Sequence, residues 1–184
     1  MKKHIIIAGA SRAAKTTLSI ELTKCGYEHY KMDSIVRGMC DIFDLDSHNW
    51  MDLSPKLAKL MDTIIKENET DTVRDYEKYV LDIPYLFPKD VKLIDTKNVI
   101  IIFLGYAHIT KEEMLLNMRK HDKDNYWCKN IPDDKLLEMI DNNIKFSKYL
   151  EKECNKLGIP YFDTSVDRIN TLRKIKKYID RLNK

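Results

Sequence analysis

Residues 4–19, HIIIAGASRAAKTTLS, decide the fold class of this 184-residue chain. The isoleucine run is continuous rather than alternating with polar residues, which is typical of a strand buried on both faces of a parallel sheet. From Gly9 onward the sequence matches G-x-x-x-x-G-K-[ST] at every fixed position except Ala14. A helix is then predicted from about Lys15 to Cys25, ended by the glycine that follows. The order of strand, loop and helix predicts a phosphate-binding loop.

Such a loop binds an anion because successive backbone N–H groups and a helix N-terminus converge on it. The Lys15 ammonium is expected to act catalytically by reaching the β- and γ-phosphates, and the Thr16 hydroxyl to hold Mg²⁺. The alternative is an ordinary strand-to-helix turn that contains Lys-Thr, and the length of the flanked match favours the phosphate loop. The residues predicted to bind the nucleotide are Gly9, Ala10, Ser11, Arg12, Ala13, Ala14, Lys15, Thr16 and Thr17.

Ala14 stands where the pattern has glycine. If the backbone there has a positive φ, alanine costs roughly 1 kcal/mol relative to glycine, and its Cβ would also crowd the phosphate. This corresponds to about tenfold weaker nucleotide binding. Two hypotheses follow: the loop binds and uses nucleotide with reduced affinity, or the chain is a nucleotide-binding protein whose catalysis is weakened or lost.

Buried strands and amphipathic helices alternate along the chain, which predicts an α/β sandwich around a parallel sheet. The predicted strands are residues 4–8, 28–31, 79–82, 99–104 and 160–163. One further helix is predicted to begin with Ser54 as N-cap and Pro55 at its first position, and to run to about Glu67. Ligands are expected at the carboxyl ends of the strands.

Two longer helical patterns close the sequence. The first runs from Asp133 to Leu157 and is ended by Gly158. Its predicted apolar stripe is Leu137, Ile140, Ile144, Leu150 and Cys154. The second repeats the pattern near the C-terminus with Ile169, Leu172, Ile175, Ile179 and Leu182.

The composition fits one domain over residues 1–184 and argues against several other classes. Basic residues number 32 and acidic residues 29, spread along the chain, so nucleic-acid binding is not expected. The four cysteines share no metal-ligand spacing and are predicted to be reduced thiols. The apolar part of the N-terminus is too short for a signal peptide, and no run approaches a membrane span. A cytoplasmic protein is therefore predicted, with its oligomeric state open.

The loop and its flanking strand and helix resemble those of the small P-loop kinases, which include adenylate, shikimate and gluconate kinases and antibiotic phosphotransferases. The resemblance extends over nearly the whole chain, although only the loop is specific. It implies a five-stranded parallel sheet of order 2-3-1-4-5, ATP and Mg²⁺ as cofactors, and a small-molecule, nucleoside or nucleotide acceptor. It also implies an acceptor-binding region at residues 34–77 and a short lid at residues 109–132.

In the kinases that it resembles, an acid after the second strand orients the acceptor hydroxyl, and a nearby arginine holds an anionic part of the acceptor. Asp33 occupies this place, with Arg37 four residues later on one helix face. The resemblance implies a catalytic and substrate-binding role for Asp33 and a substrate-binding role for Arg37. The alternatives are a helix cap formed by Asp33 and a solvated ion pair between the two residues.

Other polar groups fall near the expected site. Asp82 ends the third predicted strand, where it could hold Mg²⁺ through water or serve only as a turn carboxylate. Arg119 is the only arginine of the expected lid, so the resemblance implies that it stabilises charge on the transferring group, with Arg12 as a substitute. A wet helix face is the alternative for Arg119. Residues 163–165 are implied to border the adenine, although Ser165 or Asp167 could instead cap the terminal helix.

Overall fold

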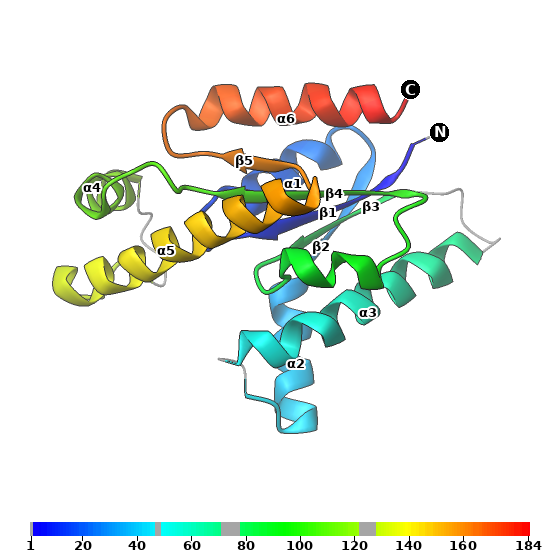
Figure 1. The fold of residues 1–184 in the computed structure, drawn as a ribbon, viewed down its shortest axis with the longest axis horizontal. Coiled ribbons are helices and arrows are strands. Elements are labelled where there is room, and N and C mark those ends of the chain that lie inside the picture. The colour runs from blue at the N-terminus through cyan, green and yellow to red at the C-terminus, as the bar shows by residue number, and fades with distance from the viewer. Residues whose placement is uncertain (1, 47–48, 71–77, 122–127) are drawn as a thin grey trace.

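The computed structural model describes residues 2–46, 49–70, 78–121 and 128–184. At its centre is a five-stranded sheet of order β2-β3-β1-β4-β5, with every neighbouring pair parallel (Figure 1). The strands are β1 (His4–Gly9), β2 (Tyr27–Lys31), β3 (Lys78–Ile83), β4 (Val99–Gly105) and β5 (Tyr161–Asp163). The predicted fold class, strand positions and strand order are confirmed.

Helices cover both faces of the sheet (Figure 1). The helices are α1 (Lys15–Thr23), α2 (Met32–Phe43), α3 (Trp50–Thr70), the 3-10 helix η1 (Pro88–Leu93), α4 (Lys111–His121), α5 (Asp133–Leu157) and α6 (Arg168–Leu182). Alternate residues of β1 explain the two layers, because Ile6 packs with α2, α3 and η1, and Ile5 packs with α1, α4 and α6. Helix α5 contributes apolar side chains to both cores.

The register of the parallel strands brings their carboxyl ends to one edge of the sheet. Asp82 on β3 lies beside Lys31 on β2 and Ile7 on β1, and Gly9 lies beside Leu104 on β4. The loop after β1, the first turn of α2 and the end of β3 are therefore neighbours, as ligand binding at the carboxyl ends of strands requires.

Helix α3 begins at Trp50, five residues before the predicted first position at Pro55, so Ser54 is not its N-cap and Pro55 lies inside the helix. The Ser54 hydroxyl is buried, donates to Asp90 Oδ2 at 2.6 Å and accepts from the backbone N–H of Phe87 at 2.8 Å. Ser54 therefore fastens η1 to α3, a long-range task that local sequence does not reveal.

The helix ends and apolar stripes differ in detail from the predictions. Helix α1 ends at Thr23, two residues early, and the expected glycine follows with a φ of 76°. In α5, Leu136 is buried in place of the predicted Leu137, which is only partly buried. In α6, Ile169 is 67% exposed because only the later isoleucines reach the sheet.

None of the four cysteines forms a disulfide in the structure. Across the described ranges, the helices are too short or too polar to span a bilayer. Residues 47–48 and 71–77 of the expected acceptor-binding region, and residues 122–127 of the expected lid, lie outside the described residues.

Candidate active site

The phosphate loop leaves β1 at a position that only glycine can occupy. Gly9 has a φ of 132°, and a Cβ built on it would lie 1.9 Å from the backbone oxygen of Leu104. The next residue, Ala10, donates its backbone N–H to the same Leu104 oxygen at 3.0 Å. Strand β4 therefore holds the start of the loop through a close backbone approach.

Two residues of the loop have left-handed backbone angles. Arg12 has a φ of 65°, and Ala14 has φ 68° and ψ 20° immediately before α1. Such alternation directs neighbouring backbone N–H groups to one side, which produces an anion-binding concavity. Ala14 thus has the positive φ that the glycine of the pattern would adopt freely, and the alanine retains the turn at the cost of backbone strain.

Lys15 folds back over its own loop. Its buried ammonium donates to the backbone oxygens of Gly9 at 3.1 Å and Ala10 at 2.8 Å. Burial lowers the pKa of Lys15, while the carboxylates of Asp82 and Asp33 oppose that shift. Both carboxylates therefore lie within electrostatic range of the Lys15 ammonium.

The Thr16 hydroxyl donates to Oδ2 of Asp82 at 2.5 Å. Asp82 is 4% exposed, and burial raises its pKa despite the opposing effects of Lys15 and Thr16. A hydroxyl and a carboxylate are the oxygen ligands that Mg²⁺ accepts, and protein sites for this ion commonly use one or two such groups beside substrate phosphates. Within the described ranges no cluster of three or more His, Cys, Asp or Glu could hold a metal alone. The residues present fit a phosphate-bound Mg²⁺.

Asp33 lies half-buried in the first turn of α2, and Arg37 is exposed one turn later. The N-cap of α2 is Lys31, and no side-chain hydrogen bond caps its N-terminus, so the alternative of Asp33 as a helix cap is not observed. Both charges act on the hydroxyl of Tyr85: burial raises the pKa of Tyr85, Asp33 raises it further and Arg37 lowers it. Asp33 therefore interacts electrostatically with both Lys15 of the phosphate loop and Tyr85.

Tyr85 is a site residue that the sequence analysis missed. It follows Asp82 by three residues, and its ring centroid lies 5.5 Å from that of Trp50 at the start of α3. The available signal was its place just beyond the carboxyl end of a central strand. One ring of this aromatic pair, Tyr85, is thus within electrostatic range of Asp33 and Arg37.

The guanidinium of Arg119 is held by the last residues of the expected lid and by Asp133 just beyond it. It donates to the backbone oxygens of Cys128, Lys129 and Ile131 and twice to Oδ1 of Asp133, at 2.5–3.1 Å. None of these acceptors belongs to the phosphate loop. The structure thus places Arg119 as an anchor for residues 128–133, because a planar fork of five donors suits several carbonyl groups at once.

A second arginine, which the sequence analysis also missed, lies beside the loop. Arg168 at the start of α6 donates from Nη2 to the backbone oxygen of Arg12 at 3.4 Å. The guanidinium groups of both arginines favour the ionised form of Tyr106, although burial raises the pKa of that residue overall. The fold therefore brings two cationic side chains from distant parts of the sequence to the loop.

The residues expected near the adenine form hydrogen bonds with one another and with the end of β4 and the residues that follow it. Asp163 accepts from the backbone N–H of Ala107 at 2.6 Å and from both the backbone and the hydroxyl of Ser165. The Thr164 hydroxyl donates to the backbone oxygen of Gly105 at 3.0 Å. The N-cap of α6 is Asp167, so the capping alternative holds for this residue and not for Ser165.

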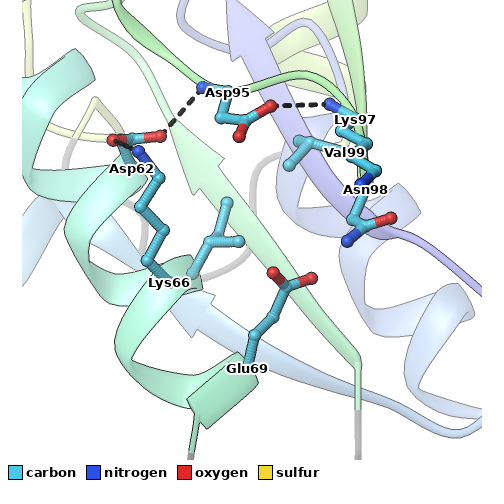
Figure 2. A pocket seen from close by; sticks show the side chains of 8 residues that line it. Asp62, Lys66, Glu69, Asp95, Lys97, Asn98 and Val99 are labelled. Atoms are coloured by element: carbon cyan, nitrogen blue, oxygen red, sulfur yellow. Dashed lines mark hydrogen bonds and ion pairs between the residues drawn. The ribbon is translucent and has the colours of Figure 1, made fainter.

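A crevice at the opposite edge of the sheet is not the candidate site. Figure 2 shows it between α3 and the segment that enters β4, where the Asp62 carboxylate accepts from the backbone of Asp95 at 2.8 Å and from Lys66 at 2.7 Å. Its volume of about 20 Å³ suits a single water molecule rather than a substrate.

Comparisons with known proteins agree on the fold. No protein-family model matches the sequence, and no curated protein sequence is significantly similar to it. A gluconokinase from Sinorhizobium meliloti 1021 is similar in structure, with a TM-score of 0.60, 13% identity, and coverage of 98% of this chain and 93% of that one.

Two shikimate kinases are also similar, each 14% identical to this chain. That of Bacteroides thetaiotaomicron has a TM-score of 0.57 over 97% of this chain and 98% of its own. That of Acinetobacter baumannii, solved in complex with shikimate, has a TM-score of 0.56 over 99% and 93%. The sheet order of the present chain and its likeness to these structures show that it has the fold of the small P-loop kinases.

Proposed function

We propose that this chain is a Mg²⁺- and ATP-dependent kinase that transfers the γ-phosphoryl group to a small-molecule acceptor. The observation that carries the proposal is the convergence of Lys15, Thr16, Asp82 and Asp33 at a loop of left-handed residues. Four groups suited to phosphoryl transfer, drawn from three separate elements, would not meet in an ordinary strand-to-helix turn. The likeness to gluconate and shikimate kinases supports the same reaction class.

The proposed roles follow from the geometry. The loop amides hold the β- and γ-phosphates, and the Lys15 ammonium exchanges the carbonyl oxygens of Gly9 and Ala10 for phosphate oxygens. Thr16 and Asp82 would hold Mg²⁺, which when bound would neutralise phosphate charge.

Asp33 would orient the acceptor hydroxyl and accept its proton. Its carboxylate accepts the hydrogen bond of the acceptor hydroxyl and aligns that oxygen with the γ-phosphorus. As the new P–O bond forms and ADP leaves, the hydroxyl proton passes to Asp33. Arg37 and Tyr85 lie where they would contact the rest of the acceptor.

Arg12 and Arg168 are the proposed cations for the transferring group, in place of Arg119. Arg12 belongs to the loop and Arg168 lies beside it at the start of α6, whereas the hydrogen bonds of Arg119 to residues 128–133 direct it elsewhere. Fixed donors of this kind stabilise developing charge without reorganisation. A cytoplasmic location, with its supply of ATP and its reducing environment for four cysteines outside any disulfide, is part of the same proposal.

The test is phosphoryl transfer from γ-labelled Mg-ATP to a panel containing gluconate, shikimate, other polyhydroxylated acids, nucleosides and nucleotides. We expect one acceptor class to be labelled, with activity reduced at least 100-fold by Lys15→Ala. Lys24→Ala, which removes an exposed lysine paired with Glu21, is the matched control and should retain full activity. Absence of both ATP binding and transfer would refute the proposal.

The second candidate function is nucleotide binding with weakened or lost turnover. The positive φ of Ala14 favours it, because this strained residue lies at the point where the loop enters α1. It predicts ATP binding without transfer to any acceptor, and recovery of transfer in Ala14→Gly. Turnover by the wild-type chain would exclude it.

A further inference from the structure

His29 on β2 has a buried ring nitrogen that lacks a hydrogen-bond partner. Among the buried side-chain polar atoms that the structure describes, only its Nε2 and the hydroxyl of Tyr161 lack one. A buried polar atom without a partner is unfavourable in a folded protein and points to a water, an ion or a functional contact that completes it.

The unpaired nitrogen lies against the candidate metal site. Nε2 of His29 is 3.8 Å from Oδ2 of Asp82, the same oxygen that accepts from Thr16. The two side chains come from the neighbouring strands β2 and β3. Lys31 is paired with Asp82, and His29, two residues before Lys31, lies on the same face of the sheet as Lys31 and Asp82. Both side chains are largely shielded from water, at 16% and 5% exposure.

The chemistry of the two groups is complementary. An ionised carboxylate only accepts hydrogen bonds, and its two oxygens offer more sites than the Thr16 hydroxyl occupies. The imidazole tautomer that suits this neighbour carries its proton on Nε2. A shift of roughly 1 Å would bring the nitrogen and oxygen to ordinary hydrogen-bond length.

We propose that His29 is a positioning residue that donates from Nε2 to Asp82 and keeps its carboxylate directed at the nucleotide-bound Mg²⁺. This inference rests on the proposed kinase function. Thr16 and His29 then hold the carboxylate from two sides, and Asp82 keeps one orientation while the nucleotide binds. Partners of this kind, which contact a metal ligand rather than the metal, commonly change metal affinity 10- to 100-fold.

The experiment compares His29→Leu, which removes the donor, with His29→Gln, whose amide can restore an N–H at a similar reach. The measurement is the Mg²⁺ concentration that gives half-maximal binding of a fluorescent ATP analogue. His29→Leu is expected to raise this concentration at least tenfold, and His29→Gln to stay within about threefold of the wild type. Binding of the analogue without Mg²⁺ should be unchanged in both variants.

His108→Leu is the matched control, because this histidine is exposed and bonds Glu151 at 3.0 Å. It should leave the Mg²⁺ midpoint unchanged. Thermal unfolding without ligand identifies any variant that is merely unstable, and His29→Met repeats the comparison if the leucine variant folds poorly. In turnover assays the loss should appear in the KM for Mg²⁺ and be recovered at saturating metal.

Each outcome decides the inference. A wild-type Mg²⁺ midpoint in His29→Leu, or an equal rise in the leucine and glutamine variants, would overturn the positioning role while leaving the kinase proposal intact. A wild-type chain that binds no nucleotide at any Mg²⁺ concentration would overturn the proposed function and this inference with it.

Discussion

Replacing Ala14 with glycine tests whether the phosphate loop is strained by one methyl group. Ala14 has φ 68° and ψ 20°, a left-handed conformation that costs an L-residue about 1 kcal/mol relative to glycine. Because the substitution relieves this strain in the folded state, Ala14→Gly should raise the free energy of unfolding by about 1 kcal/mol. For a chain of this length that corresponds to a rise in Tm of about 2–4 °C.

The effect on nucleotide affinity should be smaller than the effect on stability. The left-handed conformation is already present without nucleotide, so its strain is common to the free and bound states and cancels in the binding free energy. Only crowding of the phosphate by the methyl group would remain. Since Ala14 as a whole is only 8% exposed, little of its surface is open to an incoming phosphate. We expect the Kd for ATP to change by less than about threefold.

Two matched substitutions separate strain from a general effect of glycine. Ala13 is fully buried and lacks a positive φ, so Ala13→Gly should lower Tm through lost methyl burial and greater freedom of the unfolded chain. Asp44, with φ 50° at the end of α2, lies outside the loop, so Asp44→Gly should leave the Kd for ATP unchanged. Tm is measured by differential scanning calorimetry, and Kd by isothermal titration. An unchanged or lower Tm in Ala14→Gly would show that the alanine does not strain the loop, and a Kd at least tenfold lower would show that its methyl group crowds the phosphate.

Three further predictions concern stability. Gly9→Ala should lower the free energy of unfolding by more than about 3 kcal/mol in urea denaturation, because its Cβ would lie 1.9 Å from the Leu104 oxygen; a wild-type midpoint would contradict the close backbone approach. Burial, with a smaller effect of Lys78, lowers the pKa of His4 to about 4. Between about pH 6.5 and pH 4, His4 is therefore protonated in the unfolded chain and neutral in the folded chain. Stability should therefore fall with decreasing pH across that window, and His4→Gln should flatten this part of the urea profile. Arg119→Lys should increase proteolytic cleavage of residues 128–133 and lower Tm, because an ammonium cannot reproduce the fork of donors; a large loss of kcat at wild-type Tm and proteolysis would instead favour a catalytic role.

The central part of the fold was predictable because its signals are local. A continuous apolar run identifies a buried strand, and parallel strands must place their carboxyl ends at one edge. On that basis alone the sequence predicts that Asp33 and Asp82 lie near Lys15. In the structure both carboxylates raise the pKa of the Lys15 ammonium against the effect of burial. His29 escaped the same reasoning, because its importance depends on which strand lies beside β2 and on the register between them.

The errors at helix α3 and in the stripe of α5 have a common physical cause. Ser-Pro is a good helix start by local preference, yet the Ser54 hydroxyl is satisfied by η1, more than thirty residues later, and the helix extends back to Trp50. Leu136 and Leu137 differ by only one position on the helix, so the facing core decides which is buried. Tertiary contacts therefore override local preference where two registers fit the pattern almost equally.

Arg119 shows why a charged residue is harder to assign than a strand end. A guanidinium reaches far from its backbone, and its final position depends on which acceptors lack other partners. The chain that returns from residue 128 to α5 presents three backbone oxygens and a carboxylate near Arg119, and it holds the side chain there. Arg168 is distant in sequence, but the parallel order of β1, β4 and β5 brings the start of α6 to the phosphate loop. Strand order, rather than the proximity of a basic residue to the loop in sequence, therefore determines which arginines can meet a bound phosphate.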